Sequence, residues 1–312
     1  MEDSRIQILL AVFNGAQFLE AQIESLRAQT YSDWELLISD DGSSDGSLEI
    51  INFYCNLDSR IHLVLDGVVA GSAKRNFFNL LGLAKADYVM FCDQDDIWDE
   101  DKIEVTLNRM RDIEAHYSST PVLVSTDLRV VDQNLDLISE SFLRMSGMKS
   151  SKVDFGYFMS SCLVTGCTMM INRSLCDLVQ RVNPNLDSIL MHDWWLSLVA
   201  SAFGRVSYID SQTISYRQHG SNSVGAKKRS IFNALVTIKD MHQHMMETID
   251  QVNEFKRVYG AELDDDNRKQ MESYLSIRSV GAWRVPARLS AAGAWRDDFL
   301  GNIGMILAII WK

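Results

Sequence analysis

Three acidic residues lie within four positions in the segment Phe91-Cys92-Asp93-Gln94-Asp95-Asp96-Ile97-Trp98, directly after the apolar run 88–92. Carboxylates this close repel one another, and they are costly to keep ionised unless a positive charge lies among them. The apolar run suits a buried strand, so Asp93, Asp95 and Asp96 would follow the end of that strand. The spacing therefore predicts a site for a divalent cation, or for a ligand that carries one.

A second acidic pair, Asp40-Asp41, also follows an apolar run and opens the turn-rich loop 40–46. If both runs are parallel strands of one sheet, both acidic stretches lie at its carboxyl edge, where ligands bind in such folds. The two stretches would then converge although they are far apart in sequence. The alternative is that each aspartate caps the helix that follows it, a position that favours Asp.

The first 98 residues alternate between apolar runs and segments with helical periodicity. The segments between the runs repeat apolar residues every three or four positions, as Leu19, Ile23 and Leu26 do. Strands that alternate with helices of this length are typical of parallel βαβ units. The sequence therefore predicts an α/β fold with a mostly parallel sheet flanked by helices. The runs that suit buried strands are 6–12, 35–39, 61–65 and 88–92.

The composition excludes several classes of protein. A chain of 312 residues that is 46% hydrophobic has enough apolar side chains for a substantial core. A formal net charge of −12 argues against a general nucleic-acid binder, which needs a basic surface. The five cysteines contain no CxxC pair, which favours a reducing compartment over a disulfide framework or a structural zinc site. We expect neither a secretory signal nor a membrane span, because no apolar run approaches about 20 residues.

Two standard nucleotide motifs are absent, and one hydrolase motif is present. No GxGxxG follows the first predicted strand, and the chain contains no GxxxxGK[ST]. Residues 42–46 match G-x-S-x-G between a strand and a helix, with Asp193 and His219 following in hydrolase order. A serine hydrolase with Ser44 as nucleophile is thus a distant alternative. It would leave the acidic segment after the fourth strand without a role.

A small and basic segment, Gly71-Ser72-Ala73-Lys74-Arg75-Asn76, opens the third predicted helix. Small residues and free amides at a helix N-terminus suit a phosphate group. Carboxylates one residue apart hold Mg²⁺ or Mn²⁺ well, and such a cation in turn binds a diphosphate. Acids, cation and phosphate-binding turn together predict a site for a nucleoside diphosphate.

Short motifs follow one another in order along residues 5–222. Together they resemble family 2 glycosyltransferases of the GT-A (Rossmann-like) fold, and are closest to the bacterial rhamnosyltransferases that build O-antigen and capsule. In that comparison 91–98 resembles the DXD motif, with Gln94 as its middle residue. The motifs are Val12-Phe13-Asn14-Gly15, Gln29–Leu36, Ser39–Asp45, Phe91–Trp98, Leu163-Val164-Thr165-Gly166-Cys167, Met191-His192-Asp193-Trp194-Trp195 and Tyr216-Arg217-Gln218-His219-Gly220.

The resemblance implies roles for individual residues. Asp41 would read the base or ribose, Asp95 would bind Mg²⁺ or Mn²⁺ with His219 as a possible second ligand, and Asp193 would be the catalytic base. His219 in a plain surface loop, and both tryptophans in the core, are the alternatives at those positions. The residues expected to bind the nucleotide sugar are Phe13, Asn14, Asp40, Asp41, Lys74, Asn76, Asp93 and Gln94, and those expected to bind the acceptor are Thr165, Gly166, His192, Trp194 and Trp195.

The resemblance also implies an activity: inverting, metal-dependent transfer of L-rhamnose from dTDP-L-rhamnose to a glycan carried on a polyprenyl diphosphate. A UDP-hexose donor is the close alternative. An inactive sugar-nucleotide binder would lack the acid at Asp193, and a nucleotidyltransferase would need a basic glycine-rich loop after the first strand.

We expect a catalytic domain at residues 1–222, divided into a nucleotide-sugar half (1–98) and an acceptor half (99–222). A helical region should follow at 223–312, with a long polar helix at 231–250. The tail 283–312 combines Arg and Trp with a short apolar end, a composition that suits the membrane–water boundary. It predicts a cytoplasmic protein that associates with the cytoplasmic face of the inner membrane. A helix packed on the catalytic domain is the alternative.

Overall fold

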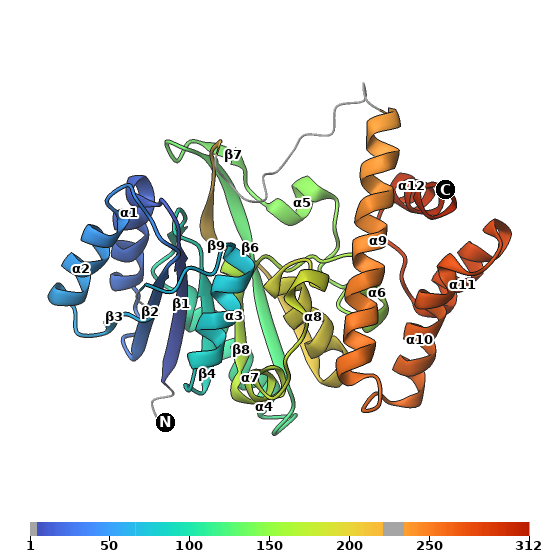
Figure 1. Cartoon of the computed structure of the whole chain (residues 1–312). Coiled ribbons are helices and arrows are strands. Elements are labelled where there is room, and N and C mark those ends of the chain that lie inside the picture. The colour runs from blue at the N-terminus through green and yellow to red at the C-terminus, as the bar shows by residue number, and fades with distance from the viewer. Residues whose placement is uncertain (1–4, 66, 221–233, 312) are drawn as a thin grey trace.

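The computed structural model describes residues 5–65, 67–220 and 234–311, and the side chains of 234–238 are not described. One twisted sheet runs through the molecule, with helices on both faces (Figure 1). Its strands are β1 (Ile6–Val12), β2 (Trp34–Asp40), β3 (Ile61–Leu63), β4 (Tyr88–Cys92), β5 (Ile97–Trp98), β6 (Val122–Asp132), β7 (Leu137–Ser139), β8 (Met169–Asn172) and β9 (Arg205–Gln218).

The sheet has the order β3-β2-β1-β4-β8-β6-β9-β5, and β7 pairs with β6. The four strands predicted from the sequence form its parallel half, in which β1 lies between β2 and β4. The second half is mixed, because β8 runs antiparallel to both of its neighbours, β4 and β6. The expected mostly parallel α/β fold is therefore confirmed. In the second half the sequence predicts a strand near 122–125, which lies in β6, but it does not predict β5, β7, β8 or β9.

Two hydrophobic cores cover the two faces of the sheet. Alternate residues of β1 point to opposite faces, as the two-residue period of a strand requires: Ile6 and Ile8 enter one core and Leu9 the other. Helices α1 (Ala16–Arg27), α2 (Ser47–Leu57) and α4 (Lys102–Glu114) supply the first core. Helices α3 (Ala73–Leu83), α7 (Arg173–Gln180) and α8 (His192–Phe203) supply the second.

The C-terminal residues are helical, as expected, and they extend the second core. The predicted helix 231–250 begins outside the described residues and continues to Tyr259. Phe255 and Tyr259 pack against Trp195, so the C-terminal helices share one core with α8. The remaining helices of the described chain are α5 (Phe142–Ser146), α6 (Phe155–Ser160), α9 (Ala234–Tyr259), α10 (Asp265–Leu275), α11 (Val285–Ala292) and α12 (Phe299–Ile310). It also has short 3-10 turns: η1 (Gly166–Thr168), η2 (Leu186–Ser188), η3 (Ser276–Arg278) and η4 (Ala282–Arg284).

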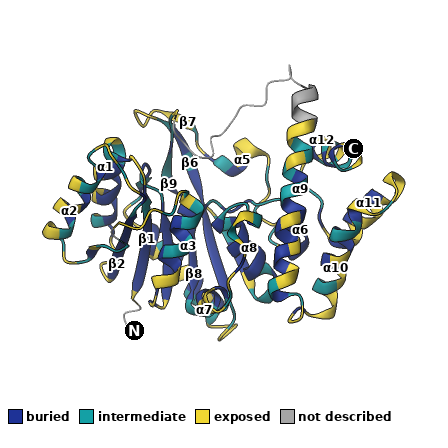
Figure 2. Cartoon of the chain, viewed as in Figure 1, coloured by how far each residue is buried: buried dark blue, intermediate teal, exposed yellow. Residues whose placement is uncertain are grey.

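The last helix, α12, is apolar but short. It packs on α9 through Gly301, Met305 and Ala308, and the opposite side is exposed (Figure 2). Across the described ranges, we find no helix with both the length and the apolar character needed to cross a bilayer.

Candidate active site

The loops after β1 and β4 are joined by a pair of hydrogen bonds. The backbone N–H of Phe13 donates to Oε1 of Gln94 at 2.8 Å, and Nε2 of Gln94 donates to the carbonyl of Phe13 at 3.1 Å. A Cβ atom at Gly15 would lie 2.4 Å from the same Oε1, so only glycine allows this approach. Gln94 therefore fixes the two carboxyl ends against each other.

The loop after β2 is folded by its own acids and by Asn14. Oδ2 of Asp40 accepts the backbone N–H groups of Gly42 and Ser43, at 3.1 and 2.9 Å. Asn14, which has a left-handed φ of 49°, accepts the N–H of Ser44 at 2.9 Å through Oδ1 and donates its own N–H to Oγ of Ser43. These residues shape the edge of the site.

Asp41 bonds to the turn that precedes α3. It is 7% exposed, and its carboxylate accepts the N–H groups of Ala70 and of Gly71, the latter at 3.0 Å. Nδ2 of Asn76 donates to the carbonyl of Ser39 at 3.1 Å, while the buried Oδ1 of Asn76 has no hydrogen-bond partner within the described part of the chain. The phosphate-type turn predicted from the sequence is thus held beside the acids of β2.

The acidic segment after β4 meets the end of β9. His219 Nε2 lies 2.7 Å from Oδ2 of Asp95, and Arg217 donates through Nε to the carbonyl of Asp95 at 2.8 Å. Asp96, fully buried, accepts the backbone N–H of Arg217 at 3.0 Å. The structure therefore brings together Asp95 and His219, the two residues predicted to bind metal.

Burial sets the charge state of this cluster. Loss of solvent, followed by repulsion from Asp95 and Asp193, raises the pKa of Asp93 well above the usual range of an aspartate. Burial and repulsion from Asp95 and Asp93 raise the pKa of Asp96 as well. Ligand atoms of Asp93, Asp96 and Cys167 lie within 4.8 Å of one another. Carboxylates with an adjacent imidazole fit Mg²⁺ or Mn²⁺, and a bound cation would offset the burial and mutual repulsion that raise these pKa values.

Asp193 lies in the first turn of α8 and is held by two backbone amides. Oδ2 accepts the N–H of Gly166 at 3.0 Å, and Oδ1 accepts the N–H of Trp194 at 2.7 Å. Burial outweighs these hydrogen bonds and raises the pKa of Asp193 to about 6. Gly166 is followed by Cys167, whose Sγ lies within 4.8 Å of a carboxylate oxygen of Asp93, so η1 connects the two acids.

The aromatic residues around Asp193 are buried. Trp195 is fully buried, with its ring 5.9 Å from that of Phe255 and 6.2 Å from that of Tyr259. Trp194 is 9% exposed, and its Nε1 donates to the carbonyl of Phe158 at 2.6 Å. This burial favours the alternative that both rings are core residues over the prediction that they bind the acceptor.

His192 is also a core residue. Its ring lies 4.1 Å from that of Phe77 and 5.3 Å from that of Phe91, and burial lowers its pKa to about 3. Neither ring nitrogen has a hydrogen-bond partner among the described residues. A Cβ atom at Gly166 would lie 2.7 Å from Nε2 of His192, so Gly166 and His192 fit together directly beneath Asp193. The carbonyl of Thr165 accepts the N–H and the hydroxyl of Thr168, which shapes η1.

The family description "Glycosyl transferase family 2" matches residues 7–178 of this chain. The chain belongs to this glycosyltransferase family. It is 31% identical to dTDP-rhamnosyl transferase RfbG of Shigella flexneri, over 70% of this chain and 74% of that protein. It is 27% identical to UDP-Glc:alpha-D-GlcNAc-diphosphoundecaprenol beta-1,3-glucosyltransferase WfgD of Escherichia coli, over 56% of this chain and 63% of that protein.

Two solved structures share the fold of this family 2 glycosyltransferase. TarS 1-349 of S. aureus in complex with UDP-GlcNAc superposes with a TM-score of 0.57 at 16% identity, covering 93% of this chain and 80% of that one. Mannosyltransferase PcManGT of Pyrobaculum calidifontis in complex with GDP-Man and Mn2+ gives a TM-score of 0.57 at 14% identity, covering 98% and 85%. The expected GT-A fold is confirmed.

Membership in the glycosyltransferase family leaves Ser44 without a hydrolytic role. Ser44 is exposed, and its hydroxyl lies 3.5 Å from Oδ1 of Asn14. His219, the base that such a hydrolase would need, is bonded to Asp95. The G-x-S-x-G match is therefore part of the loop after β2, which is bonded to the loop after β1.

Two cations beside the acids were not among the predicted site residues. Arg217 belongs to the YRQHG motif, but its bonds to Asp95 and Asp96 cross more than 120 residues of sequence. Lys102 is fully buried, with Nζ 3.4 Å from the carbonyl of Thr168 and 4.7 Å from the centre of the Trp98 ring. A lysine at the first position of an amphipathic helix normally faces solvent, so its sequence position carried no signal.

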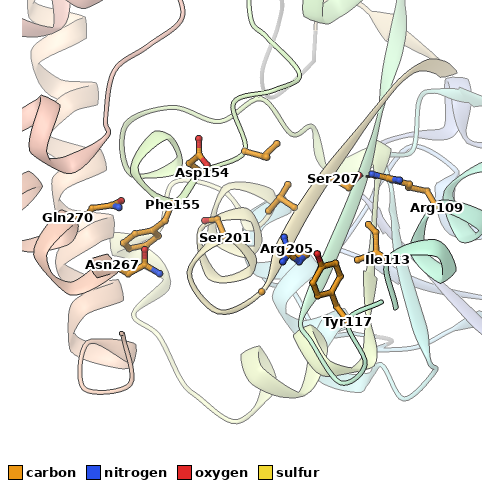
Figure 3. Close-up of a pocket in the computed structure, with 13 residues that line it drawn as sticks. Arg109, Ile113, Tyr117, Asp154, Phe155, Ser201, Arg205, Ser207, Asn267 and Gln270 are labelled. Atoms are coloured by element: carbon orange, nitrogen blue, oxygen red, sulfur yellow. Dashed lines mark hydrogen bonds between the residues drawn. The ribbon is translucent and has the colours of Figure 1, made fainter. Parts of the chain in front are cut away.

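A cavity of about 440 Å³ lies at the opposite edge of the sheet, and none of the predicted site residues lines it. Figure 3 shows Tyr117 and Arg205 on one side and Asn267 and Gln270 of α10 on the other. Arg205 begins β9 and pairs with the first residue of β6, which places the cavity at the amino ends of these strands. It is separate from the acidic site.

Proposed function

We propose that this glycosyltransferase inverts the anomeric centre of a nucleotide-diphosphate sugar, with Asp193 as the general base. The observation that supports this most directly is that neighbouring residues of η1 contact both acids: the N–H of Gly166 donates to Asp193, and Sγ of Cys167 lies within 4.8 Å of a carboxylate oxygen of Asp93. In the proposed reaction the ionised Asp193 takes the proton of an acceptor hydroxyl. The hydroxyl oxygen bonds to the anomeric carbon, and the bond from that carbon to the diphosphate oxygen breaks on the opposite face.

Asp93, Asp95 and His219 would hold a divalent cation, Mg²⁺ or Mn²⁺. When bound, such a cation offsets the negative charge of the departing nucleoside diphosphate. Asp41, Asn14 and the turn before α3 would border the nucleotide. Phe13, Asp40, Lys74, Asn76 and Gln94 would shape the same donor site, and Thr165 and Gly166 the acceptor side.

We propose dTDP-L-rhamnose as the donor, and the support is the likeness to RfbG. A UDP-hexose is the second candidate, because WfgD, named for UDP-Glc, is also similar. A panel of nucleotide sugars tested by thermal shift, with and without Mn²⁺, distinguishes them, because a bound ligand stabilises the folded state by mass action. The largest Mn²⁺-dependent shift should come from dTDP-L-rhamnose. A larger shift with UDP-glucose would replace this assignment.

The name of WfgD describes a diphosphoundecaprenol acceptor, and we propose a lipid-linked glycan acceptor here as well. The enzyme would then work at the cytoplasmic face of the inner membrane, with residues 1–222 as the catalytic domain and 223–312 as a membrane-associating helical region. The support lies in the C-terminal helices. Side chains of η4 and α12 that are exposed include Trp283 and Phe299, each 77% exposed, and Leu300, 76% exposed.

Sedimentation with anionic vesicles tests this association in the full chain. The double variant Phe299→Ser/Leu300→Ser should stay in the supernatant while the wild type pellets and is partly released at high salt. The matched control is Phe53→Ser on α2, which is 60% exposed and far from the tail in sequence. Equal pelleting of all three proteins, or of none, contradicts the membrane role of the tail.

A further inference from the structure

The segment 183–191 leads directly into the catalytic helix α8. It has one short 3-10 turn, η2, and otherwise no regular structure. The backbone amides of such a segment need partners when they are buried. Where those partners lie decides how Asp193, two residues beyond the segment, is held.

One set of partners comes from α9, more than 60 residues further along the chain. Oε1 of Gln251 accepts the N–H of Leu190 at 2.9 Å, and Oε1 of Glu254 accepts the N–H of Asn185 at 2.5 Å. Arg257, bonded to Glu254, donates to the carbonyl of Asn183 at 3.1 Å. The side chains at 251, 254 and 257 lie on successive turns of one face of the helix, so α9 holds the segment at three points.

The second set of partners of the segment 183–191 comes from the first turn of α3. Nζ of Lys74 donates to the carbonyl of Ile189, and Arg75 pairs with Asp187 at 2.7 Å. The segment 183–191 is thus bonded to both the donor side of the site and the C-terminal helices. Its position depends on both.

The buried amide of Gln251 is not explained by packing. Helix α9 also buries Ile249, Val252 and Phe255, which are ordinary core residues, whereas Gln251 is a fully buried polar side chain. Its Nε2 has no hydrogen-bond partner among the described residues. An apolar side chain would avoid that unpaired donor, so the function of the glutamine that the structure shows is its bond to Leu190.

We propose that Gln251 and Glu254 are positioning residues for the catalytic base. They act through the backbone of the segment 183–191 and set where α8 begins, and hence where the carboxylate of Asp193 lies. A displacement of about 1 Å in a catalytic group can lower a rate by roughly 10²-fold. This inference rests on the proposed role of Asp193.

The test compares Gln251→Met, which keeps the length of the side chain but removes the acceptor, with Gln243→Met, the same change at an exposed position of α9. The first should lower kcat by roughly 10- to 100-fold. Its Kd for dTDP with Mn²⁺ should stay within about twofold of wild type, because Asp193 is not expected to contact the nucleotide. The control should change neither quantity.

A second pair of variants guards against a folding defect. Glu254→Gln keeps an oxygen acceptor for the amide of Asn185 and should retain activity, whereas Glu254→Leu should lose it. Native-state hydrogen exchange measures the geometry without a sugar acceptor: the amide of Leu190 should exchange faster in Gln251→Met and stay protected in Gln243→Met. An unchanged Leu190 exchange rate, or an unchanged kcat in a folded Gln251→Met, overturns the inference.

The double variant Gln251→Met/Asp193→Asn separates this inference from the proposed function. If Gln251 acts through the base, the double variant should be no slower than Asp193→Asn alone. Multiplied losses would mean that Gln251 acts elsewhere, which overturns the inference only. Normal turnover by Asp193→Asn would instead refute the base, and with it the proposed mechanism.

Discussion

The pKa of the proposed base can be tested by a pH profile of kcat. Burial raises the pKa of Asp193 to about 6, and the hydrogen bonds from Gly166 and Trp194 only partly oppose that shift. A general base works in its ionised form, so activity should fall as the pH falls through this value. An aspartate with its ordinary pKa would remain ionised and give no such fall.

The size of the effect follows from the pKa. With a pKa of about 6, roughly nine-tenths of Asp193 is ionised at pH 7 and about one-tenth at pH 5, so kcat should fall about tenfold. With the ordinary value of 3.8, more than about nine-tenths would still be ionised at pH 5. The two cases differ enough for a simple rate measurement to separate them.

Release of nucleoside diphosphate at saturating donor and acceptor is the suitable assay. The pKa of Asp93 is also raised, so its titration must be kept apart from that of the base. Varying Mn²⁺ does this, because a bound cation favours the ionised form of Asp93 and should shift any contribution of Asp93 to lower pH. The fall in kcat that is due to protonation of Asp193 should persist at saturating Mn²⁺.

Asp193→Asn completes the test. It should lower kcat by roughly 10²- to 10⁴-fold, the usual contribution of a general base, and its residual rate should be flat between pH 5 and 7. A profile with the same acid limb in the variant would assign that limb to another group. Wild-type activity that is constant from pH 7 to 5 would refute a base with a raised pKa.

Three further outcomes are expected. Asp95→Ala should abolish Mn²⁺-dependent binding of dTDP in calorimetry, because it removes a carboxylate ligand, and full activity in EDTA would contradict the metal requirement. Gly15→Ala should weaken dTDP binding and lower the free energy of unfolding by about 1–3 kcal/mol, because the added Cβ would lie 2.4 Å from Oε1 of Gln94. An unchanged dTDP affinity in calorimetry and an unchanged stability in urea unfolding would contradict this. Trp195→Ala should lower the free energy of unfolding by about 3–5 kcal/mol, as for a buried core ring, and unchanged stability with a raised KM for the acceptor would restore the sugar-binding role.

The parallel half of the sheet could be predicted because its information is local. The run 6–12 is apolar at nearly every position, as a strand covered on both faces must be, and β1 has those same bounds. The helix through Leu19, Ile23 and Leu26 carries its core face in its own spacing. Each element could therefore be assigned without knowing its neighbours.

The other half of the sheet depends on pairing between distant segments. β8 is only Met169–Asn172, and its antiparallel place between β4 and β6 is decided by packing rather than by its own sequence. β9 mixes buried and exposed residues along Arg205–Gln218, so no clear period marks it as a strand. Because β9 was missed, the contact of Asp95 with His219 could be predicted from resemblance but not from strand geometry.

The tryptophans show a different limit. A ring in an active-site motif and a ring in a core have the same spacing, so the sequence left both alternatives open for Trp194 and Trp195. The choice depends on Phe255 and Tyr259, which pack on Trp195 from a helix about 60 residues later. The interaction of Gln251 with the segment before α8 arises in the same way.

The charge balance around the acidic segment explains why a cation is expected there. Asp96 receives a backbone amide from Arg217, and Asp95 an imidazole from His219. The side-chain partner of Asp93 is the thiol of Cys167, whose own pKa burial raises well above its usual value, so that the thiol is neutral at pH 7. Asp93 therefore gains no positive charge from this partner, and the negative charges of Asp95 and Asp193 both raise its pKa. The uncompensated negative charge of Asp93 and Asp193 favours a donor that binds together with its metal ion. The positive charge of that ion would also favour the ionised form of Asp193, the proposed base.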